Sequence, residues 1–308
     1  MYYYKLYGMK IESELEFLPL VLCEDDAVCD VKIQAAPLSE EIQERCKVQM
    51  YGFGRAYSWL SNATCQIQVY DGERITYALT GGGNPAWLQT YLLGYGISML
   101  ALQKDLLPMH CSVVSDAAGA VLIAGESGTG KSTVTTAFLD AGYGLMADDM
   151  ALVDGKNVYP AFPYQKLCRD VVIRKGYRLE ELSYIDEEKD KFLAPYKGEF
   201  SLEAKPVKGF ILLHMTGEEH VTVNELTGFE RFHVYAGNLF LRKLLKEKKY
   251  EPHIGQKCLE MASAVPLLCL GRPEKGDTAA AVVKEAMHWV KSLMSVPAAA
   301  EAAAQEKG

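Results

Sequence analysis

The sequence has no excess of positive charge. Its 32 lysines and arginines are outnumbered by 40 aspartates and glutamates, which gives a formal net charge of −8 at pH 7 over 308 residues. A protein that binds nucleic acid through its phosphates needs a basic patch, and an acidic chain is a poor candidate for that role. We therefore expect no nucleic-acid partner.

Paired cysteines and a secretion signal are also missing. The eight cysteines are scattered and contain no C-x-x-C pair, so the spacing typical of zinc ligands is absent. The opening stretch MYYYKLYGMK lacks the apolar core of a signal peptide. These absences predict a reducing, cytoplasmic setting in which the thiols stay free and mostly serve as small buried hydrophobic groups.

No apolar run is long enough to span a bilayer comfortably. The candidate is Ala86–Leu107, which follows Asn84-Pro85, an N-cap residue with proline at the first helical position. Polar residues interrupt this run and glycines weaken it, namely Gln89, Gly94, Gly96, Gln103, Lys104 and Asp105. We predict a buried connecting helix and no membrane partner.

What the chain does have is a large apolar fraction, 49%, enough for one large domain or two ordinary ones. Residues 1 to about 80 are β-rich, with strand-like stretches at Tyr2–Ile11 and Val28–Ile33. The alternating stretch Cys65–Tyr70, followed by the turn Asp71-Gly72 and Ile75–Tyr77, predicts a hairpin. This region shows no catalytic pattern. It is either a packing or partner-recognition module, or a sheet whose open edge holds an extended peptide.

The most informative stretch is Gly119–Asp149. Ala120–Ala124 is a short apolar run that predicts a buried strand, and Ser132–Ala141 predicts a helix that stops at Gly142. Between them the sequence GESGTGKS fits the phosphate-binding pattern G-x-x-x-x-G-K-[ST] in full. A chance glycine-rich turn is the alternative, and the strand and helix on either side argue against it.

The chemistry of this loop is specific. Its glycines allow backbone angles that place successive N–H groups in one concavity for phosphate oxygens, and the helix adds its positive N-terminal end. Lys131 is expected to reach the β- and γ-phosphates of ATP, and the Ser132 hydroxyl to bind Mg²⁺. The nucleotide-binding residues predicted here are Gly125, Glu126, Ser127, Gly128, Thr129, Gly130, Lys131, Ser132 and Thr133.

Two further polar groups flank the loop. Asp148 and Asp149 follow the predicted strand Tyr143–Ala147, and such strand-terminal acids commonly bind the nucleotide's Mg²⁺ or act as a general base. His110 lies in the predicted strand Met109–Val114, which is close enough to pair with the strand of the loop. The alternatives are a turn with solvated charges for the aspartates and a structural role for the histidine.

His110, the loop and the Asp148-Asp149 pair, in this order and at these spacings, resemble the catalytic domain of HPr kinase/phosphorylase, a phosphoenolpyruvate carboxykinase-like P-loop family. The stretches LLPMHCSVV, GESGTGKST and GYGLMADDMALV are most similar to its smaller relatives, such as the kinases of lasso-peptide precursors. The resemblance implies Asp149 as the base that deprotonates a serine hydroxyl, with His110 and Asp148 in support. It also implies Lys131 on the phosphates and Ser132 on Mg²⁺. The strand-terminal Asp148 is the second predicted ligand of that ion.

The rest of the chain is less specific. Lys175–Lys191 is charged and predicts a mobile loop, either a lid or a surface excursion. A strand at Val207–Leu213 is expected to pair with Val221–Val223, and a helix is expected at Phe229–Lys246. The basic run at the end of that helix is a solvated face or a site for an acidic ligand, with Arg242 as the best candidate. A strand at Val265–Leu270 and a helix at Thr278–Met294 complete the pattern.

The sequence thus predicts an α/β protein. A β-rich N-terminal domain with its connecting helix covers residues 1–104, a P-loop kinase domain with a mixed sheet covers 105–296, and a flexible tail covers 297–308. The predicted reaction transfers the γ-phosphoryl of ATP to a serine in a peptide or protein. A kinase of free serine or a similar small molecule, and a nucleotide-sensing protein without turnover, are the alternatives. The oligomeric state stays open, with a homo-oligomer among the options.

Overall fold

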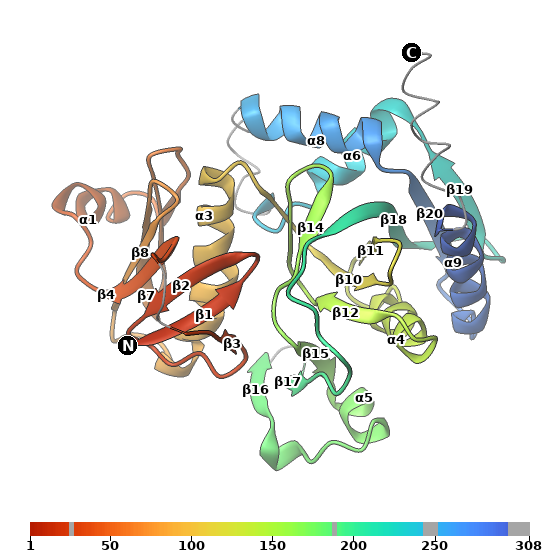
Figure 1. The fold of residues 1–308 in the computed structure, drawn as a ribbon, viewed down its shortest axis with the longest axis horizontal. Helices are drawn as coiled ribbons and strands as arrows, with labels where there is room; N and C mark the ends of the chain where they lie inside the picture. Colours follow the sequence, from red (N-terminus) through yellow and green to blue (C-terminus); the bar gives the residue numbers. More distant parts are fainter. Residues whose placement is uncertain (25–27, 187–189, 243–251, 295–308) are drawn as a thin grey trace.

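The computed structural model describes residues 1–24, 28–186, 190–242 and 252–294 (Figure 1). The chain is a mixed α/β protein, as the sequence predicts, built on sheets of eight, nine and three strands. The predicted tail 297–308 lies outside the described residues.

The N-terminal sheet contains both antiparallel and parallel pairs, and helix α1 (Glu40–Cys46) follows its fourth strand. In spatial order its strands are β3 (Val21–Leu22), β1 (Tyr2–Leu6), β2 (Met9–Ser13), β4 (Val31–Ala35), β8 (Arg74–Leu79), β7 (Cys65–Tyr70), β6 (Tyr57–Ser61) and β5 (Tyr51–Gly52). The hairpin around Asp71-Gly72 is confirmed, and both turn residues have positive φ, 49° and 69°. The stretch Tyr2–Ile11 is not one strand, because Tyr7 and Gly8 make a turn, with φ of 52° and 76°.

The connecting segment is helical, as predicted, but in four pieces. They are the 3₁₀ turn η1 (Pro85–Trp87), α2 (Leu88–Tyr91), the π-helical turn η2 (Leu92–Gly96) and α3 (Ile97–Gln103). The Asn84 side chain accepts a hydrogen bond from the Ala86 N–H at 3.0 Å, which is the predicted N-cap. The helix ends near Lys104 and not at Leu107, because Asp105 adopts a positive φ of 58°. Within the described residues, no helix combines the length and the apolar character that crossing a membrane requires.

The nine-stranded sheet is mixed, with β11 parallel to β18 and β18 parallel to β20. Its strands are β12 (Gly144–Ala147), β10 (Cys111–Ser115), β11 (Ala120–Gly125), β18 (Lys205–Thr216), β14 (Asn157–Tyr159), β13 (Ala151–Val153) and β9 (Leu107–Met109), with β20 (Leu267–Pro273) beside β18 and β19 (Thr222–Leu226) beside β20. The expected pairing of Val221–Val223 with Val207–Leu213 is wrong. Strand β20 lies between them and pairs with both.

Alternate residues of the buried strand β11 face two different apolar cores, as a fully buried strand requires. Val121 and Ile123 pack with α4 (Lys131–Asp140) and α9 (Ala279–Met294) on one face of the sheet. Leu122 faces the core on the other side, which α6 (Gly228–Gly237) and α8 (Pro252–Ala264) help to cover. Figure 1 shows α3 between the N-terminal sheet and this larger one.

Near the C-terminal end, one predicted helix is shorter than expected and one helix was missed. The helix expected at Phe229–Lys246 is α6, which ends at Gly237 with Asn238 as its C-cap. The basic residues of this run from Lys243 to Lys249 lie outside the described residues. Helix α8 was not predicted, and the strand at Val265–Leu270 and the helix at Thr278–Met294 are confirmed as β20 and α9 within a few residues.

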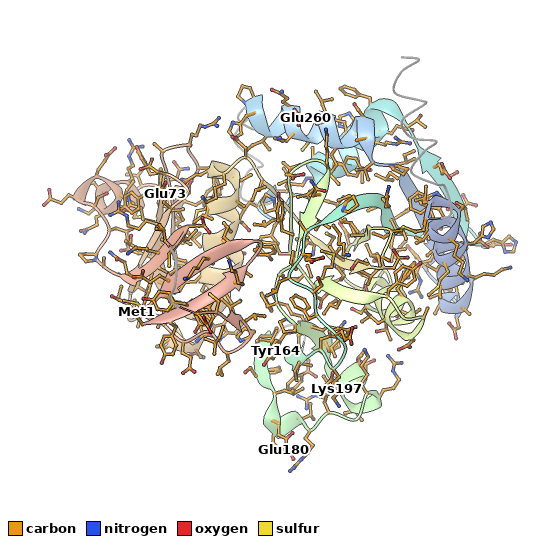
Figure 2. The ribbon with its side chains drawn as sticks, viewed as in Figure 1. Met1, Glu73, Tyr164, Glu180, Lys197 and Glu260 are labelled. Carbon is orange, nitrogen blue, oxygen red and sulfur yellow. The ribbon has the colours of Figure 1, made fainter. Side chains whose placement is uncertain are left out.

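The three-stranded sheet forms a small unit at one end of the molecule, with Tyr164 at its junction with the rest and Glu180 near its outer end (Figure 2). It consists of β15 (Tyr164–Cys168), β17 (Lys191–Pro195) and β16 (Ser183–Asp186), with α5 (Arg169–Arg174) and the 3₁₀ turn η3 (Leu179–Glu181). Its own core is formed by Leu167, Val172, Phe192 and Ala194. The described part of Lys175–Lys191 is therefore not a featureless loop, because it supplies β16 and η3 to this unit.

The division of the chain near residue 104 stays a prediction. One apolar core contains residues from both sides of it, among them Tyr7 from the N-terminal hairpin, Ile97 from the connecting helix and Met150 after the aspartate pair.

Candidate functional site

The glycine-rich loop joins strand β11 to helix α4, as the sequence predicts. Gly128 and Gly130 have φ of 88° and 103°, a region that side chains disfavour. A Cβ on Gly125 would lie 2.6 Å from the carbonyl oxygen of Leu213, so no larger residue fits there. Gly130 is the N-cap of α4 and provides no side-chain cap, which leaves the first N–H groups of the helix available to a ligand.

Hairpin β10–β11 brings His110 to this loop. Cys111 pairs with Ala124, so His110 lies beside Gly125, at the end of β10 where the expected strand Met109–Val114 is broken. The Lys131 Nζ atom lies 3.3 Å from His110 Nε2 and 3.4 Å from the Gly125 carbonyl oxygen. The lysine thus folds over the mouth of the loop and contacts the histidine.

The aspartate pair lies at the same end of the sheet. Strand β12 pairs with β10, with Ala147 opposite Val113, so the residues that follow Ala147 come close to His110. Asp149 adopts a positive φ of 71°, and its Oδ1 lies 3.9 Å from His110 Nδ1. Lys131, His110 and Asp149 therefore form one continuous group, although the sequence separates them widely.

Both aspartates are held by groups that the sequence did not single out. Lys166 Nζ donates to Asp149 Oδ2 at 2.6 Å, and the Lys166 backbone N–H donates to Asp148 Oδ2 at 2.8 Å. Ser112 Oγ donates to the other oxygen of Asp148 at 2.6 Å. Lys166 comes from β15 of the small sheet, 17 residues after Asp149, and no motif marks that spacing.

The electrostatics of this group follow from its packing. Burial alone would raise the pKa of Asp149, but the charge and hydrogen bond of Lys166, with the charge of Lys131, outweigh it and hold that pKa well below its ordinary value. Burial, and then repulsion from Lys131, lowers the pKa of His110 to about 4. The imidazole is therefore neutral at pH 7, and accepting a hydrogen bond from Lys131 at Nε2 places its proton on Nδ1, toward Asp149.

A second cation lies against the loop. A Cβ built on Gly130 would come 3.5 Å from Nη1 of Arg272, which is in strand β20. The Nε atom of Arg272 is buried and has no hydrogen-bond partner within the described residues. Arg242, the arginine that the sequence favoured, is exposed and donates to the Gly237 carbonyl oxygen at 2.9 Å. Arg272 is thus the guanidinium beside the loop, and only the pairing of β18 with β20 reveals it.

The predicted metal ligands are not in contact with each other. Ser132 is exposed, and the described part of the chain has no hydrogen bond between it and Asp148; it also has no cluster of three or more histidine, cysteine or acidic residues suited to a metal. Mg²⁺ bound with a nucleotide takes most of its ligands from phosphates and water and needs only one or two protein oxygens. Each carboxylate oxygen of Asp148 accepts one hydrogen bond from the described residues and keeps a further lone pair, so Ser132 and Asp148 fit such a site.

Comparisons with known proteins include a weak likeness to a solved structure. No protein-family model matches the chain, and no curated protein matches it. Among solved structures, the chain is similar to the HPr(Ser) kinase/phosphatase from Coxiella burnetii, with 13% sequence identity, a TM-score of 0.29 and coverage of 60% of this chain and 97% of that one. A likeness at this level carries no weight for activity, so function must be argued from the site itself.

Proposed function

We propose that the protein is an ATP-dependent kinase that transfers the γ-phosphoryl group to a serine hydroxyl in a peptide or protein. One observation carries this proposal: a continuous group runs from Lys131 on the phosphate loop, through His110, to Asp149 and its partner Lys166. Phosphoryl transfer needs cations on the phosphates and a carboxylate next to the attacking hydroxyl, and this group supplies both within a few ångströms.

The loop would bind the triphosphate of ATP. The free N–H groups at the start of α4 point positive charge at the phosphates, and Lys131 is already folded over the mouth of the loop. Arg272 adds a planar donor whose buried Nε has no partner within the described residues. A bound Mg²⁺, held by Ser132 and Asp148, would neutralise phosphate charge and leave the chemistry to this chain's own side chains.

In the transfer step the serine oxygen forms a bond to the γ-phosphorus while the bond from that phosphorus to the bridging oxygen of ADP breaks. The serine proton passes to Asp149, and ADP leaves. In the structure Lys166 holds Asp149 strongly ionised. The γ-phosphate competes for Lys166 and Lys131, which weakens their hold on the carboxylate and increases its affinity for the proton. The neutral His110 orients Asp149 without adding a second positive charge to it.

The setting of this reaction follows the sequence-based expectations. The acceptor is a peptide or protein with an accessible serine, the location is cytoplasmic, and neither nucleic acid nor membrane takes part.

The decisive experiment compares Asp149→Asn with Asp140→Asn, a matched change of an exposed aspartate at the end of α4. ADP release and phosphoserine formation are measured with ATP, Mg²⁺ and either free serine or a mixture of serine-containing peptides. We expect Asp149→Asn to reduce transfer by about 10²–10⁴-fold, while ATP affinity, measured by calorimetry, changes by only a few-fold. Equal turnover in both variants would instead favour a nucleotide-binding protein without catalysis at Asp149, and transfer to free serine alone would favour a small-molecule kinase.

A further inference from the structure

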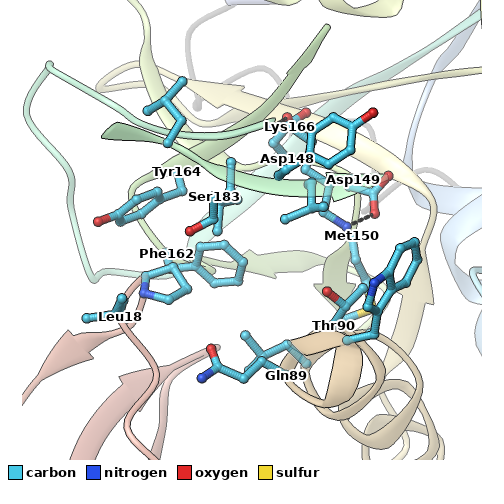
Figure 3. A pocket seen from close by; sticks show the side chains of 18 of the residues that line it. Leu18, Gln89, Thr90, Asp148, Asp149, Met150, Phe162, Tyr164, Lys166 and Ser183 are labelled. Atoms are coloured by element: carbon cyan, nitrogen blue, oxygen red, sulfur yellow. Dashed lines mark hydrogen bonds and ion pairs between the residues drawn. The ribbon is translucent and has the colours of Figure 1, made fainter. Parts of the chain in front are cut away.

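A cavity of about 570 Å³ opens beside Asp149. In Figure 3, Asp148, Asp149 and Lys166 form one wall, and Leu18, Gln89 and Thr90 lie across from them. The remaining walls come from the connecting helix and the small three-stranded sheet. Three parts of the fold that are far apart in sequence therefore meet around the carboxylate.

Asp149 stands between this cavity and the phosphate loop. Its Oδ1 faces His110, which contacts Lys131 of the loop, and its Oδ2 is paired with Lys166, whose side chain lines the cavity. None of the described lining residues belongs to the loop 125–132. A nucleotide on the loop and a second molecule in the cavity would thus approach the same carboxylate from two sides, which is the arrangement that an in-line transfer between them needs.

The size of the cavity favours an acceptor larger than one amino acid. If each of the about seven heavy atoms of free serine took the ~30 Å³ that a water occupies in the liquid, the molecule would fill roughly 200 Å³. More than half of the 570 Å³ would then remain unfilled. A serine with neighbouring residues attached fits the volume better.

The lining indicates which neighbours those are. Large apolar side chains dominate several walls, among them Trp87, Met150, Phe162, Leu193 and Phe240. Two more, Leu18 and Tyr184, line the cavity while 71% and 47% exposed. Such surface is stabilised when an apolar partner covers it.

The charges around the cavity are unbalanced. Among the described residues, three acidic side chains, Asp148, Asp149 and Glu181, and one basic side chain, Lys166, line it. Lys166 pairs with Asp149, and Glu181 pairs at 3.0 Å with Arg178 outside the lining, so of the described lining acids Asp148 is the one without an ion pair. An acidic side chain next to the acceptor serine would meet like charges and be disfavoured, whereas neutral or basic neighbours would not.

We propose that this cavity is the acceptor site, and that it binds a peptide segment in which the serine has apolar neighbours and no acidic ones. The inference rests on the proposed kinase function. It adds the location of the acceptor site and the preference of that site for the residues next to the serine. The serine hydroxyl lies against Asp149, its oxygen forms the new bond to the γ-phosphorus of ATP, its proton goes to Asp149, and ADP is the leaving group. The connecting helix and the loop that carries Leu18 thereby become part of substrate recognition.

The test uses Leu18→Asp, with Leu22→Asp as its matched control. Both leucines are exposed, 71% and 69%, so neither change threatens the core, but only Leu18 lines the cavity. A second variant, Ser183→Trp, fills the cavity from the exposed strand β16. Two randomised peptide libraries are used, one with a fixed central serine for transfer and one with a fixed central alanine for direct binding.

For the wild type and Leu22→Asp we expect selection of apolar and against acidic neighbours in both libraries. In Leu18→Asp and Ser183→Trp the KM for the selected serine peptide and the dissociation constant of its alanine version should rise by about tenfold or more. ATP affinity should stay unchanged in both variants, because none of the described lining residues belongs to the loop 125–132.

The possible failures are distinguishable. Peptide transfer that is unaffected by both cavity variants would place the acceptor elsewhere and leave the kinase function standing. A loss of ATP affinity in Ser183→Trp would assign the cavity to the nucleotide. Peptide binding without any transfer, together with an Asp149→Asn variant that changes no rate, would overturn the proposed function and keep the cavity as a peptide site.

Discussion

Replacing Lys166 by methionine tests the electrostatic core of the site. The Lys166 Nζ and Asp149 Oδ2 atoms are 2.6 Å apart, and the two side chains are only 26% and 21% exposed. At that distance and an effective dielectric constant of about 20, the Coulomb attraction is about 6 kcal/mol before desolvation is counted. Desolvation offsets much of this, and removing one partner of a buried pair typically costs about 3–5 kcal/mol. Because this pair keeps some contact with water, we expect Lys166→Met to lower the free energy of unfolding at pH 7 by about 2–3 kcal/mol.

The stability difference between wild type and Lys166→Met should change with pH in a definite direction. The lysine helps to hold the pKa of Asp149 below its ordinary value of 3.8, so the stability that it adds is fully present above that value and is lost as the pH falls through the folded pKa. Without Lys166 the pKa of Asp149 rises, and the variant can relieve its unpaired charge by binding a proton. The gap between wild type and variant should therefore stay constant from pH 7 to about pH 4 and shrink as the pH is lowered further, below 3.8.

Urea unfolding followed by tryptophan fluorescence at several pH values measures this gap. Lys284→Met changes an exposed lysine on α9 and serves as the control, with an expected effect within about 0.5 kcal/mol. A gap that stays constant below pH 3.8 as well would refute the reasoning, because it would mean that Lys166 acts through packing and not through its charge.

Three further predictions concern residues around this pair. Tyr7→Phe removes the hydroxyl that donates to the buried Met150 carbonyl oxygen at 2.9 Å and should lower the free energy of unfolding by about 1–2 kcal/mol in the same urea assay. Arg272→Met should weaken ATP binding by about 10- to 100-fold in calorimetry, because a charge-assisted contact is worth about 1.5–3 kcal/mol; an unchanged affinity would exclude contact with the phosphates. Burial lowers the pKa of His110 to about 4 from 6.5, so the unfolded chain binds a proton first and wild-type stability should fall between pH 6.5 and pH 4. His110→Asn should remove this loss of unfolding free energy. We expect the loss to be about 1 kcal/mol or less, because 42% of the His110 side chain is exposed.

The parts of the fold that the sequence predicts well depend on local chemistry. The loop between β11 and α4 is fixed by glycines and by the apolar runs on either side, so its position is confirmed within one residue. The same holds for the hairpin at Asp71-Gly72, where the turn residues themselves adopt the positive φ that such a turn requires. The N-cap at Asn84 is also a contact between neighbours in sequence.

The parts that sequence reasoning missed depend on contacts between distant segments. Lys166 reaches Asp149 only because β15 of the small sheet returns beside the aspartates, and no local pattern distinguishes it from other surface lysines. Arg272 approaches the loop only because β20 inserts between β18 and β19, where the sequence suggested a simple hairpin. The many charged residues of Lys175–Lys191 suggested a loop. A few apolar side chains nevertheless form the small core against which the described part of this segment packs.

The N-terminal region supports the site in two ways. Met150 follows Asp149, which has an unfavourable positive φ of 71°, and a backbone in that region is maintained only when its surroundings fix it. Tyr7 of the N-terminal hairpin holds the Met150 carbonyl oxygen, and Ser98 of the connecting helix donates to the Met150 sulfur at 2.8 Å. The same hairpin and helix form walls of the cavity beside Asp149. Because one set of contacts fixes the carboxylate and shapes the space before it, a change that loosens the N-terminal region should impair peptide transfer more than ATP binding, whose loop is anchored by β11 and α4 on the other sheet.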